Sequence, residues 1–346
     1  MKKALVSVMI LLTIVSCGGN RVVGNLGRRI VSSRPEKEMT LSPEYSISGP
    51  CLEATWGVHC VADSVIILQL RDLTGYCFRA LNLESRTYQD FLLVGRGPDE
   101  VLAGFYSDKR KENGHTLLDI TAINEGLLLS IDLEETLLTG QTKFYSKKEI
   151  MPLATISFPI GDKILSEVIN DNDIYSYKLY SQEDQSESWK LQPFGTEEYL
   201  ALYQPLFSSC MKIKPDGKKL SLSMLFFNGI NIIDIGGDNH IGVSTSKKND
   251  DSSIVRKAVK NKRLGDRYYY MQHDVTDDNI YALYYDCAPS ESNGRTSSMI
   301  HVFSWDGELK AVYHLDEPLI SITVSDDGKT LYGLTAEETL FVYKME

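Results

Sequence analysis

Hydrophobic and polar residues alternate along most of the chain, as they do in β-strands that have one buried face. The pattern is clearest in the last unit, Ile320–Lys344, which reads ISITVSDDGKTLYGLTAEETLFVYK. Two alternating runs flank the tight-turn sequence Ser325-Asp326-Asp327-Gly328, and a third run follows. Asp, Asn and Gly tolerate the positive φ angles that such turns need. The unit therefore predicts strand, turn, strand, turn and strand.

The same unit recurs five more times upstream. The six turn markers are Asp63, Glu125, Asn172, Gly217, Asp278 and Asp327. They are separated by 45 to 62 residues, which is the length of a four-stranded propeller blade. Because a single blade cannot bury both of its faces, the units must stack around an axis. The sequence predicts an all-β, six-bladed β-propeller; seven blades are the alternative, since about 305 residues also divide into seven acceptable blades.

The chain is expected to have three parts: a signal peptide at 1–16, a lipidated cysteine with a flexible tether at 17–40, and the propeller at 41–346. The last unit supplies only three strands. We expect Leu41–Ser48 to supply the fourth strand of that blade, because this pairing closes the ring and removes an open sheet edge.

The N-terminal segment is typical of an export signal. Lys2 and Lys3 precede an apolar run, Ala4–Val15, that is too short to span a bilayer. Ile14-Val15-Ser16-Cys17-Gly18 then resembles the bacterial lipoprotein processing box, in which cleavage before the cysteine leaves Cys17 as the site of lipid attachment. An ordinary signal peptide with an incidental cysteine is the alternative. Several acyl chains on one cysteine would give permanent membrane attachment.

Charge and cysteine content narrow the function. The net charge of −11 argues against a nucleic-acid partner, which would require a basic surface. Beyond Cys17, the chain has Cys51, Cys60, Cys77, Cys210 and Cys287. An exported compartment permits disulfides, but five is an odd number, and buried small hydrophobic residues are an equally good interpretation.

Two interruptions of the repeat are candidate contact loops, because propellers usually bind through loops at one rim. The first is Gly95–Glu100, and the second is the basic insertion Lys247–Arg267. A structural turn and a solvated charged loop, respectively, are the alternative interpretations. The candidate rim residues are Arg96, Asp99, Glu100, Arg256, Lys257, Lys260, Arg263 and Tyr268.

Gly95-Arg96-Gly97-Pro98-Asp99-Glu100 follows an apolar strand and is similar to a GRGPGEF-like motif of TolB-like six-bladed propeller lipoproteins of Bacteroidetes. The chain departs from that motif at Asp99, where a small glycine is usual. The resemblance implies a propeller fold in the cell envelope. It also tilts the expectation toward protein binding, by analogy of fold alone.

No stretch of sequence shows the spacing of a metal site, a nucleophile elbow or a phosphate loop, so no catalytic residue, metal ligand or cofactor is predicted. The expected function is a lipid-anchored envelope module that binds an envelope protein or a glycan. We prefer the periplasmic face of the outer membrane, since no acidic run follows Cys17. The alternative is a metal-dependent hydrolase or lyase that acts on carbohydrate or lactone-like substrates at the propeller axis.

Overall fold

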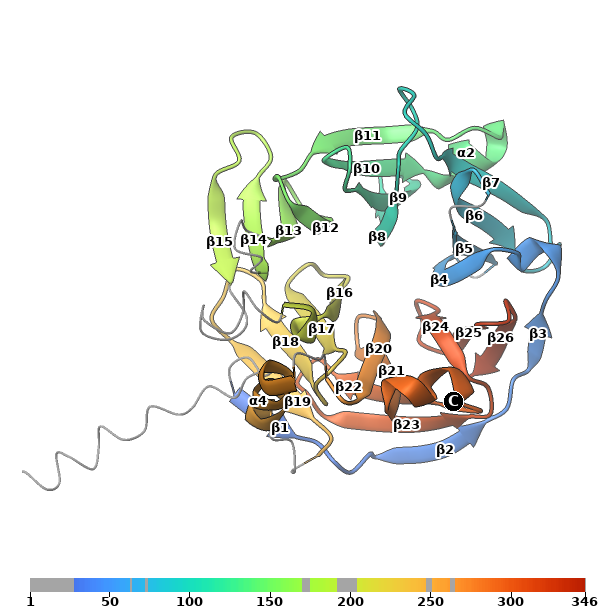
Figure 1. Ribbon diagram of the computed structural model, residues 1–346. Coiled ribbons are helices and arrows are strands. Elements are labelled where there is room, and N and C mark those ends of the chain that lie inside the picture. The colour runs from blue at the N-terminus through green and yellow to red at the C-terminus, as the bar shows by residue number, and fades with distance from the viewer. Residues whose placement is uncertain are drawn as a thin grey trace, which may run out of the picture.

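Six antiparallel sheets surround a central axis in the computed structural model (Figure 1). The structure describes residues 28–62, 64–71, 74–169, 175–191, 204–246, 251–261 and 265–345. Cys17 and the expected signal peptide lie outside the described residues. The prediction of an all-β, six-bladed propeller is confirmed, and the seven-bladed alternative is wrong.

Each blade has four strands in meander order. Blade 1 contains β4 (Thr55–Ala62), β5 (Val65–Leu70), β6 (Tyr76–Asn82) and β7 (Tyr88–Leu93). Blade 2 contains β8 (Phe105–Glu112), β9 (His115–Ala122), β10 (Leu127–Asp132) and β11 (Phe144–Glu149). Blade 3 contains β12 (Ala154–Ile160), β13 (Lys163–Ile169), β14 (Tyr175–Ser181) and β15 (Glu187–Leu191).

The second half of the ring repeats this order. Blade 4 contains β16 (Ser209–Ile213), β17 (Lys219–Met224), β18 (Ile230–Asp234) and β19 (His240–Ser244). Blade 5 contains β20 (Tyr268–Val275), β21 (Asn279–Cys287), β22 (Ser298–Ser304) and β23 (Leu309–Leu315). Blade 6 contains β24 (Leu319–Val324), β25 (Thr330–Thr335), β26 (Leu340–Lys344) and β3 (Tyr45–Ile47).

The prediction for ring closure is confirmed at Tyr45–Ile47, within the expected segment. β3 pairs antiparallel with β26, and Ile47 lies opposite Leu340. Residues near the start of the described chain thereby complete the last blade. Ile47 and Leu340 are both buried, so closure also contributes apolar surface to the core.

The expected tether at 17–40 contains two strands, which corrects that boundary. β1 (Arg28–Val31) pairs in parallel with β19, and β2 (Lys37–Leu41) pairs in parallel with β23. Each becomes the fifth, outermost strand of its blade, and the segment runs around the outside of the ring (Figure 1). These strands are only partly buried, and backbone pairing to an open edge holds them, with Met39 and Leu41 of β2 adding contacts to the core.

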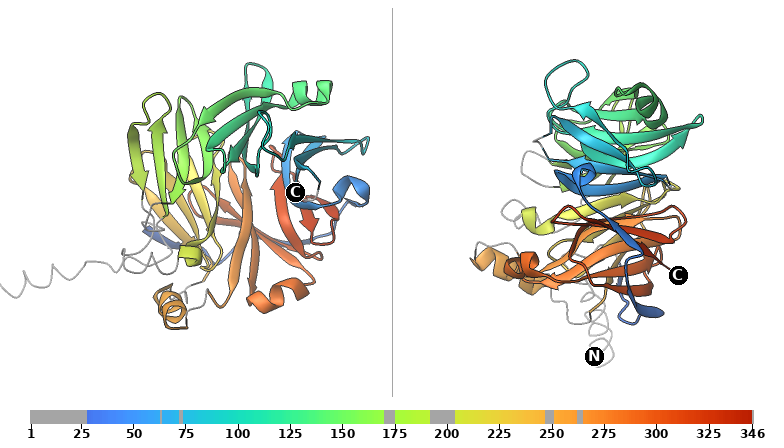
Figure 2. Two further views of the ribbon diagram at one scale, coloured as in Figure 1. Left: turned by 45° about the horizontal axis from the view of Figure 1, so that its top comes forward. Right: turned by 90° about the vertical axis from the view of Figure 1, so that its right-hand side faces the viewer.

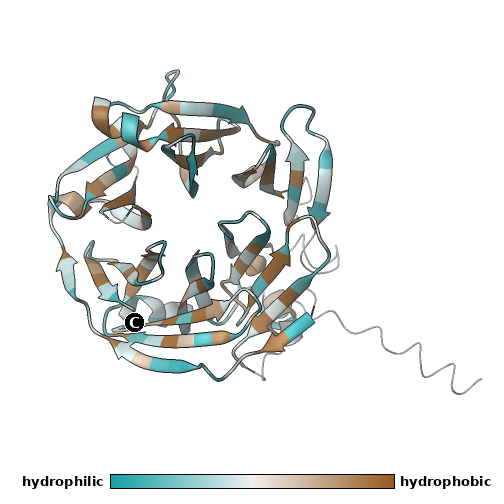
Figure 3. Cartoon of the chain, turned by 180° about the vertical axis from the view of Figure 1, so that it is seen from behind, coloured by the Kyte–Doolittle hydropathy of each residue, from teal (hydrophilic) through white to brown (hydrophobic). Residues whose placement is uncertain are grey.

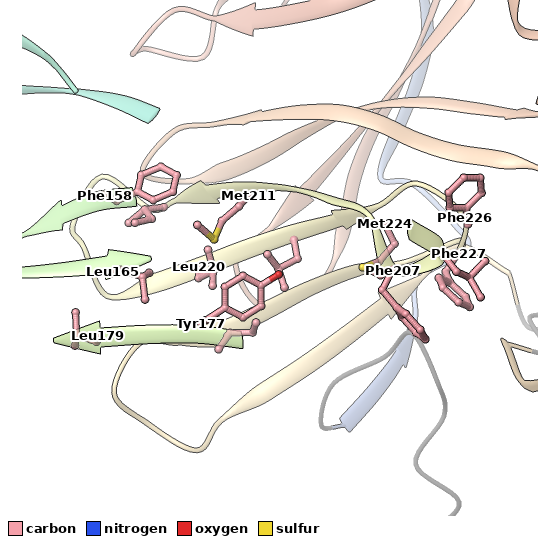
Figure 4. Packing of buried hydrophobic residues seen from close by; sticks show 14 of the residues in the cluster. Phe158, Leu165, Tyr177, Leu179, Phe207, Met211, Leu220, Met224, Phe226 and Phe227 are labelled. Atoms are coloured by element: carbon pink, nitrogen blue, oxygen red, sulfur yellow. The ribbon is translucent and has the colours of Figure 1, made fainter. Parts of the chain in front are cut away.

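Hydrophobic residues are concentrated in the strands, and the turns are mostly polar (Figure 3). The buried side chains form six clusters, one at each interface between neighbouring blades. At the interface of blades 3 and 4, Phe158, Leu165 and Tyr177 face Met211 and Leu220 (Figure 4). Burial of sheet faces between blades, rather than one central core, therefore stabilises the ring.

The turn markers of the second and third units were assigned to the wrong turn. Glu125 follows β9, and Asn172, outside the described residues, falls between β13 and β14, whereas the other four markers fall between the first and second strands of a blade. The first strands of these two blades, β8 and β12, were missed. β8 reads FYSDKRKE and lacks an apolar run, and β12 contains Pro159, which an innermost strand accommodates because its axial edge is unpaired.

In the described part of the chain, two α-helices and three 3₁₀ turns connect the strands. They are α2 (Leu133–Thr139), α4 (Asp251–Asn261), η1 (Pro50–Leu52), η2 (Gln204–Phe207) and η3 (Pro289–Gly294). In the right-hand view of Figure 2, α4 lies on one side of the ring and the C-terminus on the other. None of the helices in the described part of the chain is long and apolar enough to cross a bilayer.

Candidate functional site: the axial mouth

The innermost strands of all six blades surround one cavity of about 600 Å³. It opens at the ends of these strands, where the turns into the second strands carry Gly161, Asp216, Asp277 and Asp326. We call this opening the axial mouth. Asp326 and Asp327 belong to one of the six turns that repeat along the sequence. In the fold, this turn lies at the rim of the cavity.

The innermost strands are sheet edges, and side chains of neighbouring blades bind their free backbone N–H groups. The backbone N–H of Cys60 donates to Thr323 Oγ1 over 2.8 Å, and that of Val58 donates to Ser321 Oγ over 3.1 Å. The backbone N–H of Val324 donates in turn to Asp274 Oδ2 over 2.8 Å. Because buried N–H groups need acceptors, these bonds fix the walls of the cavity as well as the contact between blades.

Lys212 lines the cavity from blade 4. Its side chain is only 10% exposed, and its Nζ lies 4.0 Å from Asp274 Oδ1 and 5.2 Å from the centre of the Tyr106 ring. The imidazole of His59 stacks on Tyr106 with ring centres 3.9 Å apart. Asp274 Oδ2 also accepts from Thr323 Oγ1 over 2.7 Å. Five blades thus contribute to one small cluster of charged and aromatic side chains.

Burial changes the ionisation of this cluster. It raises the pKa of Asp108 to about 6, although Lys212 and the backbone N–H of Lys109 oppose the shift. Burial, reinforced by Lys212, lowers the pKa of His59 to about 3, so this imidazole is neutral near pH 7. For Asp274, burial acts to raise the pKa, but Lys212 and the bonds from Thr323 and Val324 outweigh it and hold the pKa below its usual value. The ionised form of Asp274 is therefore favoured beside Lys212.

The rim of the axial mouth is built from ion pairs within and between blades. Lys109 of blade 2 pairs with Asp326 of blade 6. Arg110 Nε lies 2.9 Å from Asp119 Oδ2, and Lys214 Nζ lies 2.6 Å from Asp216 Oδ2. The rim is consequently polar but close to neutral, and it suits ligands that hydrogen-bond.

A buried histidine lies beside this cluster without reaching solvent. His273 Nε2 lies 2.6 Å from Ser221 Oγ, and His273 Nδ1 lies 3.0 Å from Ser223 Oγ. Burial, with Lys212 as the second cause, lowers the pKa of His273 to about 3. With hydroxyl partners on both nitrogens, the imidazole connects blades 4 and 5, and it belongs to the packing between them.

The predicted rim loop Gly95–Glu100 precedes β8 and so lies on the face opposite the axial mouth. Glu100 Oε2 accepts from the backbone N–H of Gly97 over 2.8 Å, and a side chain at Gly95 or Gly97 would collide with Glu100. Asp99 Oδ1 accepts from Lys147 Nζ over 2.8 Å, and Arg96 is exposed. Asp99 and Glu100 therefore form contacts that hold this turn in place, and Arg96 is exposed to solvent.

The basic insertion forms α4, again on the face opposite the axial mouth. Arg256, Lys257 and Lys260 are exposed, and Lys257 Nζ lies 3.9 Å from Asp266 Oδ2. Tyr268 instead packs on Phe226 with ring centres 5.6 Å apart. Arg263 lies outside the described residues. The two predicted loops therefore share a face, but the structure gives no contact that brings their candidate residues into one site.

Metal chemistry has no support among the described residues, in which no group of three or more His, Cys, Asp or Glu side chains could hold an ion. Carboxylates at strand ends have other partners: Asp119 pairs with Arg110, Asp132 caps α2, and Asp286 pairs with Arg267. Cys51, Cys60, Cys77, Cys210 and Cys287 are all free thiols, four of them buried, which favours their interpretation as small core residues.

Sequence reasoning missed the central residues of the axial mouth: His59, Tyr106, Asp108, Lys212 and Asp274. They come from four different blades, so no local motif could connect them. One signal was available, because the run Asp108-Lys109-Arg110-Lys111 breaks the hydrophobic pattern where a first strand was required.

Comparisons with known proteins support the fold. No protein-family model and no curated protein matches the chain. A crystal structure of a member of the DUF4221 family from Bacteroides vulgatus is similar, with a TM-score of 0.57 and 11% identity, over 88% of this chain and 97% of that chain. A structure of the mitotic checkpoint complex has a TM-score of 0.48 at 10% identity, over 92% of this chain and 95% of that chain, and carries no argument. The chain has a six-bladed β-propeller fold with a Bacteroides structural neighbour.

Proposed function

We propose that this protein is a lipid-anchored propeller of the cell envelope that binds its ligand or partner at the axial mouth. The cavity of about 600 Å³ carries the proposal, because binding sites are concave and hold a few convergent polar groups. The interblade hydrogen bonds to Cys60 and Val324 give that cavity fixed walls, which suit a binding module. Membership of the TolB-like lipoproteins is part of this proposal and rests on the motif at Gly95–Glu100.

The anchor in this proposal is a lipid on Cys17, on the periplasmic face of the outer membrane. β1 runs parallel to β19, which leads away from the axial mouth, so the described chain enters the ring on the mouth side. Cys17 precedes Arg28 by eleven positions, a span of at most about 40 Å. A lipid there would hold the mouth face near the membrane. Cys17→Ala should abolish lipid labelling and release the protein from the membrane fraction; continued labelling would contradict the anchor.

Binding at the axial mouth is tested by photo-crosslinking on both faces of the ring in cells. A photoreactive residue replaces Asp277, which is exposed at the mouth, or Leu93, which is 43% exposed at the end of β7 on the opposite face. We expect adducts from position 277 and none from position 93. Adducts from position 93 alone, or from neither position, would contradict binding at the mouth.

A further inference from the structure

Lys212 is a buried cation without a hydrogen-bond acceptor among the described residues. Its side chain is 10% exposed, and its only ion pair in this part of the chain is the 4.0 Å approach to Asp274, which is longer than a hydrogen bond. The other cations at the rim have closer partners or are exposed. These are Lys109 with Asp326, Arg110 with Asp119, Lys214 with Asp216, and the exposed Lys111.

Asp274 cannot move to satisfy Lys212 without losing its own bonds. Its Oδ2 accepts from Thr323 Oγ1 over 2.7 Å and from the backbone N–H of Val324 over 2.8 Å. These bonds hold the carboxylate against blade 6. The ammonium of Lys212 has three N–H donors, and an ammonium removed from water needs acceptors in exchange. The structure thus leaves a place in the cavity for an oxygen of a ligand.

In the same cavity, one oxygen of Asp108 and one of Asp274 accept no hydrogen bond from the described residues. Asp108 Oδ1 accepts from the backbone N–H of Lys109 over 2.8 Å, and Asp108 forms no ion pair with another described residue. Asp274 Oδ1 has only the distant Lys212. Uncharged hydroxyl groups suit both carboxylates, because hydroxyl-to-carboxylate hydrogen bonds are strong and a ligand cation would be repelled by Lys212.

The two carboxylates beside Lys212 oppose more than one negative charge on the part of the ligand that binds this ammonium. A phosphate dianion next to Lys212 would also lie near Asp108 and Asp274, and the repulsion would oppose binding. A carboxylate carries one charge and offers two acceptor oxygens to the ammonium. The volume of about 600 Å³ accommodates one or two sugar rings.

We propose, on the basis of the proposed function, that the axial mouth binds a polyhydroxylated carboxylate of the sugar-acid type, with the ligand carboxylate on Lys212 and ligand hydroxyl groups on Asp108 and Asp274. Lys212 orients the ligand through its single negative group. The two carboxylates select hydroxyl groups beside it. No covalent step is involved.

Calorimetric titration of the full-length protein with three probes tests the ligand class: D-glucuronate, D-glucose and acetate. We expect D-glucuronate to bind at least about tenfold more tightly than either of the others, because each lacks one half of the recognised chemistry. Glucose binding as tightly as glucuronate would overturn the role of Lys212. Acetate binding as tightly would overturn the role of the carboxylates, and absence of binding by all three would overturn the proposal.

A matched pair of variants assigns the binding to Lys212. Lys212→Met should weaken D-glucuronate binding at least about tenfold and leave glucose binding unchanged. Lys178→Met removes a half-buried strand cation outside the axial mouth, one already paired with Glu187, and should change binding less than about threefold. Equal loss in both variants would contradict the assignment.

If Lys212→Met does not fold, the three-probe comparison on the unaltered protein still tests the ligand class. Crosslinking at position 277 without glucuronate binding would refute the ligand class and leave the proposed function standing.

Discussion

Neutralising Asp108 should stabilise the propeller near neutral pH. Its carboxyl group is buried in the axial mouth, and its pKa is raised from 3.8 to about 6. Between about pH 4 and pH 6 the native state therefore binds more protons than the unfolded chain, and the free energy of unfolding falls as the pH rises through this window. Above about pH 6 the native carboxylate is charged at a site that disfavours charge.

The magnitude follows from the shift. About two pKa units correspond to about 3 kcal/mol, and partial solvent access at the cavity reduces this to about 2 kcal/mol. Asp108→Asn keeps an acceptor for the backbone N–H of Lys109 and removes the charge. We expect the variant to match the unaltered protein below about pH 4 and to be more stable by about 2 kcal/mol at pH 7.

Urea unfolding at a series of pH values measures this difference. Because the two proteins are compared at each pH, the contributions of all other titrating groups to the free energy of unfolding cancel. Asp277→Asn is the matched control, because Asp277 lies exposed on the same rim, and its stability should change by less than about 0.5 kcal/mol at any pH. A difference for Asp108→Asn that is independent of pH, or a loss of stability at pH 7, would refute the reasoning.

Three further substitutions test the packing of the ring, each measured by urea unfolding. Arg79→Ala should cost about 3–5 kcal/mol, because it leaves Asp90 without the guanidinium that contacts both of its oxygens at 2.6 and 2.9 Å; a loss below about 1 kcal/mol would contradict this. Gly333→Ala should cost about 1–3 kcal/mol, since the new Cβ would lie 2.4 Å from Leu319 Cδ1, whereas the open site at Gly294 should tolerate Ala. Ile47→Asp should cost more than about 3 kcal/mol by placing a charge at the ring closure; an unchanged midpoint would show that β3 is dispensable.

The fold was predictable from the sequence where local chemistry repeats. Alternation in Ile320–Lys344 and its counterparts reports a half-buried strand, and turn residues such as Gly328, with φ of +69°, report the hairpins. Ring closure through Tyr45–Ile47 followed from counting the strands of the last unit. The alternation and the turns depend on neighbouring residues only, and the count of strands follows from them, so one sequence is sufficient to show these features.

The strands next to the axis were harder to predict because they face polar surroundings. β8 places Asp108 and Lys109 at the cavity, and the charge that makes it part of the site also removes the hydrophobic pattern of a strand. Lys212 and Asp274 lie 62 positions apart in the neighbouring blades 4 and 5, and only the packing of these blades brings them within 4.0 Å. The candidate site therefore could not be predicted from motifs, and the loops that interrupt the repeat lie on the opposite face.

In the axial mouth, charged groups, including one that lowers the stability of the fold, are held in fixed positions. A binding site requires such fixed polar groups. Asp108 is held charged at neutral pH at a site that disfavours charge, so it opposes folding in the absence of a ligand, and Lys212 lacks a close acceptor among the described residues. Hydrogen bonds between blades nevertheless fix Asp274 against Thr323. A ligand that offers a carboxylate to Lys212 and a hydroxyl group to Asp108 would satisfy both groups without a rearrangement of the walls. Its binding free energy would then include relief of the cost at Asp108, so the stabilisation by D-glucuronate should be larger in the unaltered protein than in Asp108→Asn.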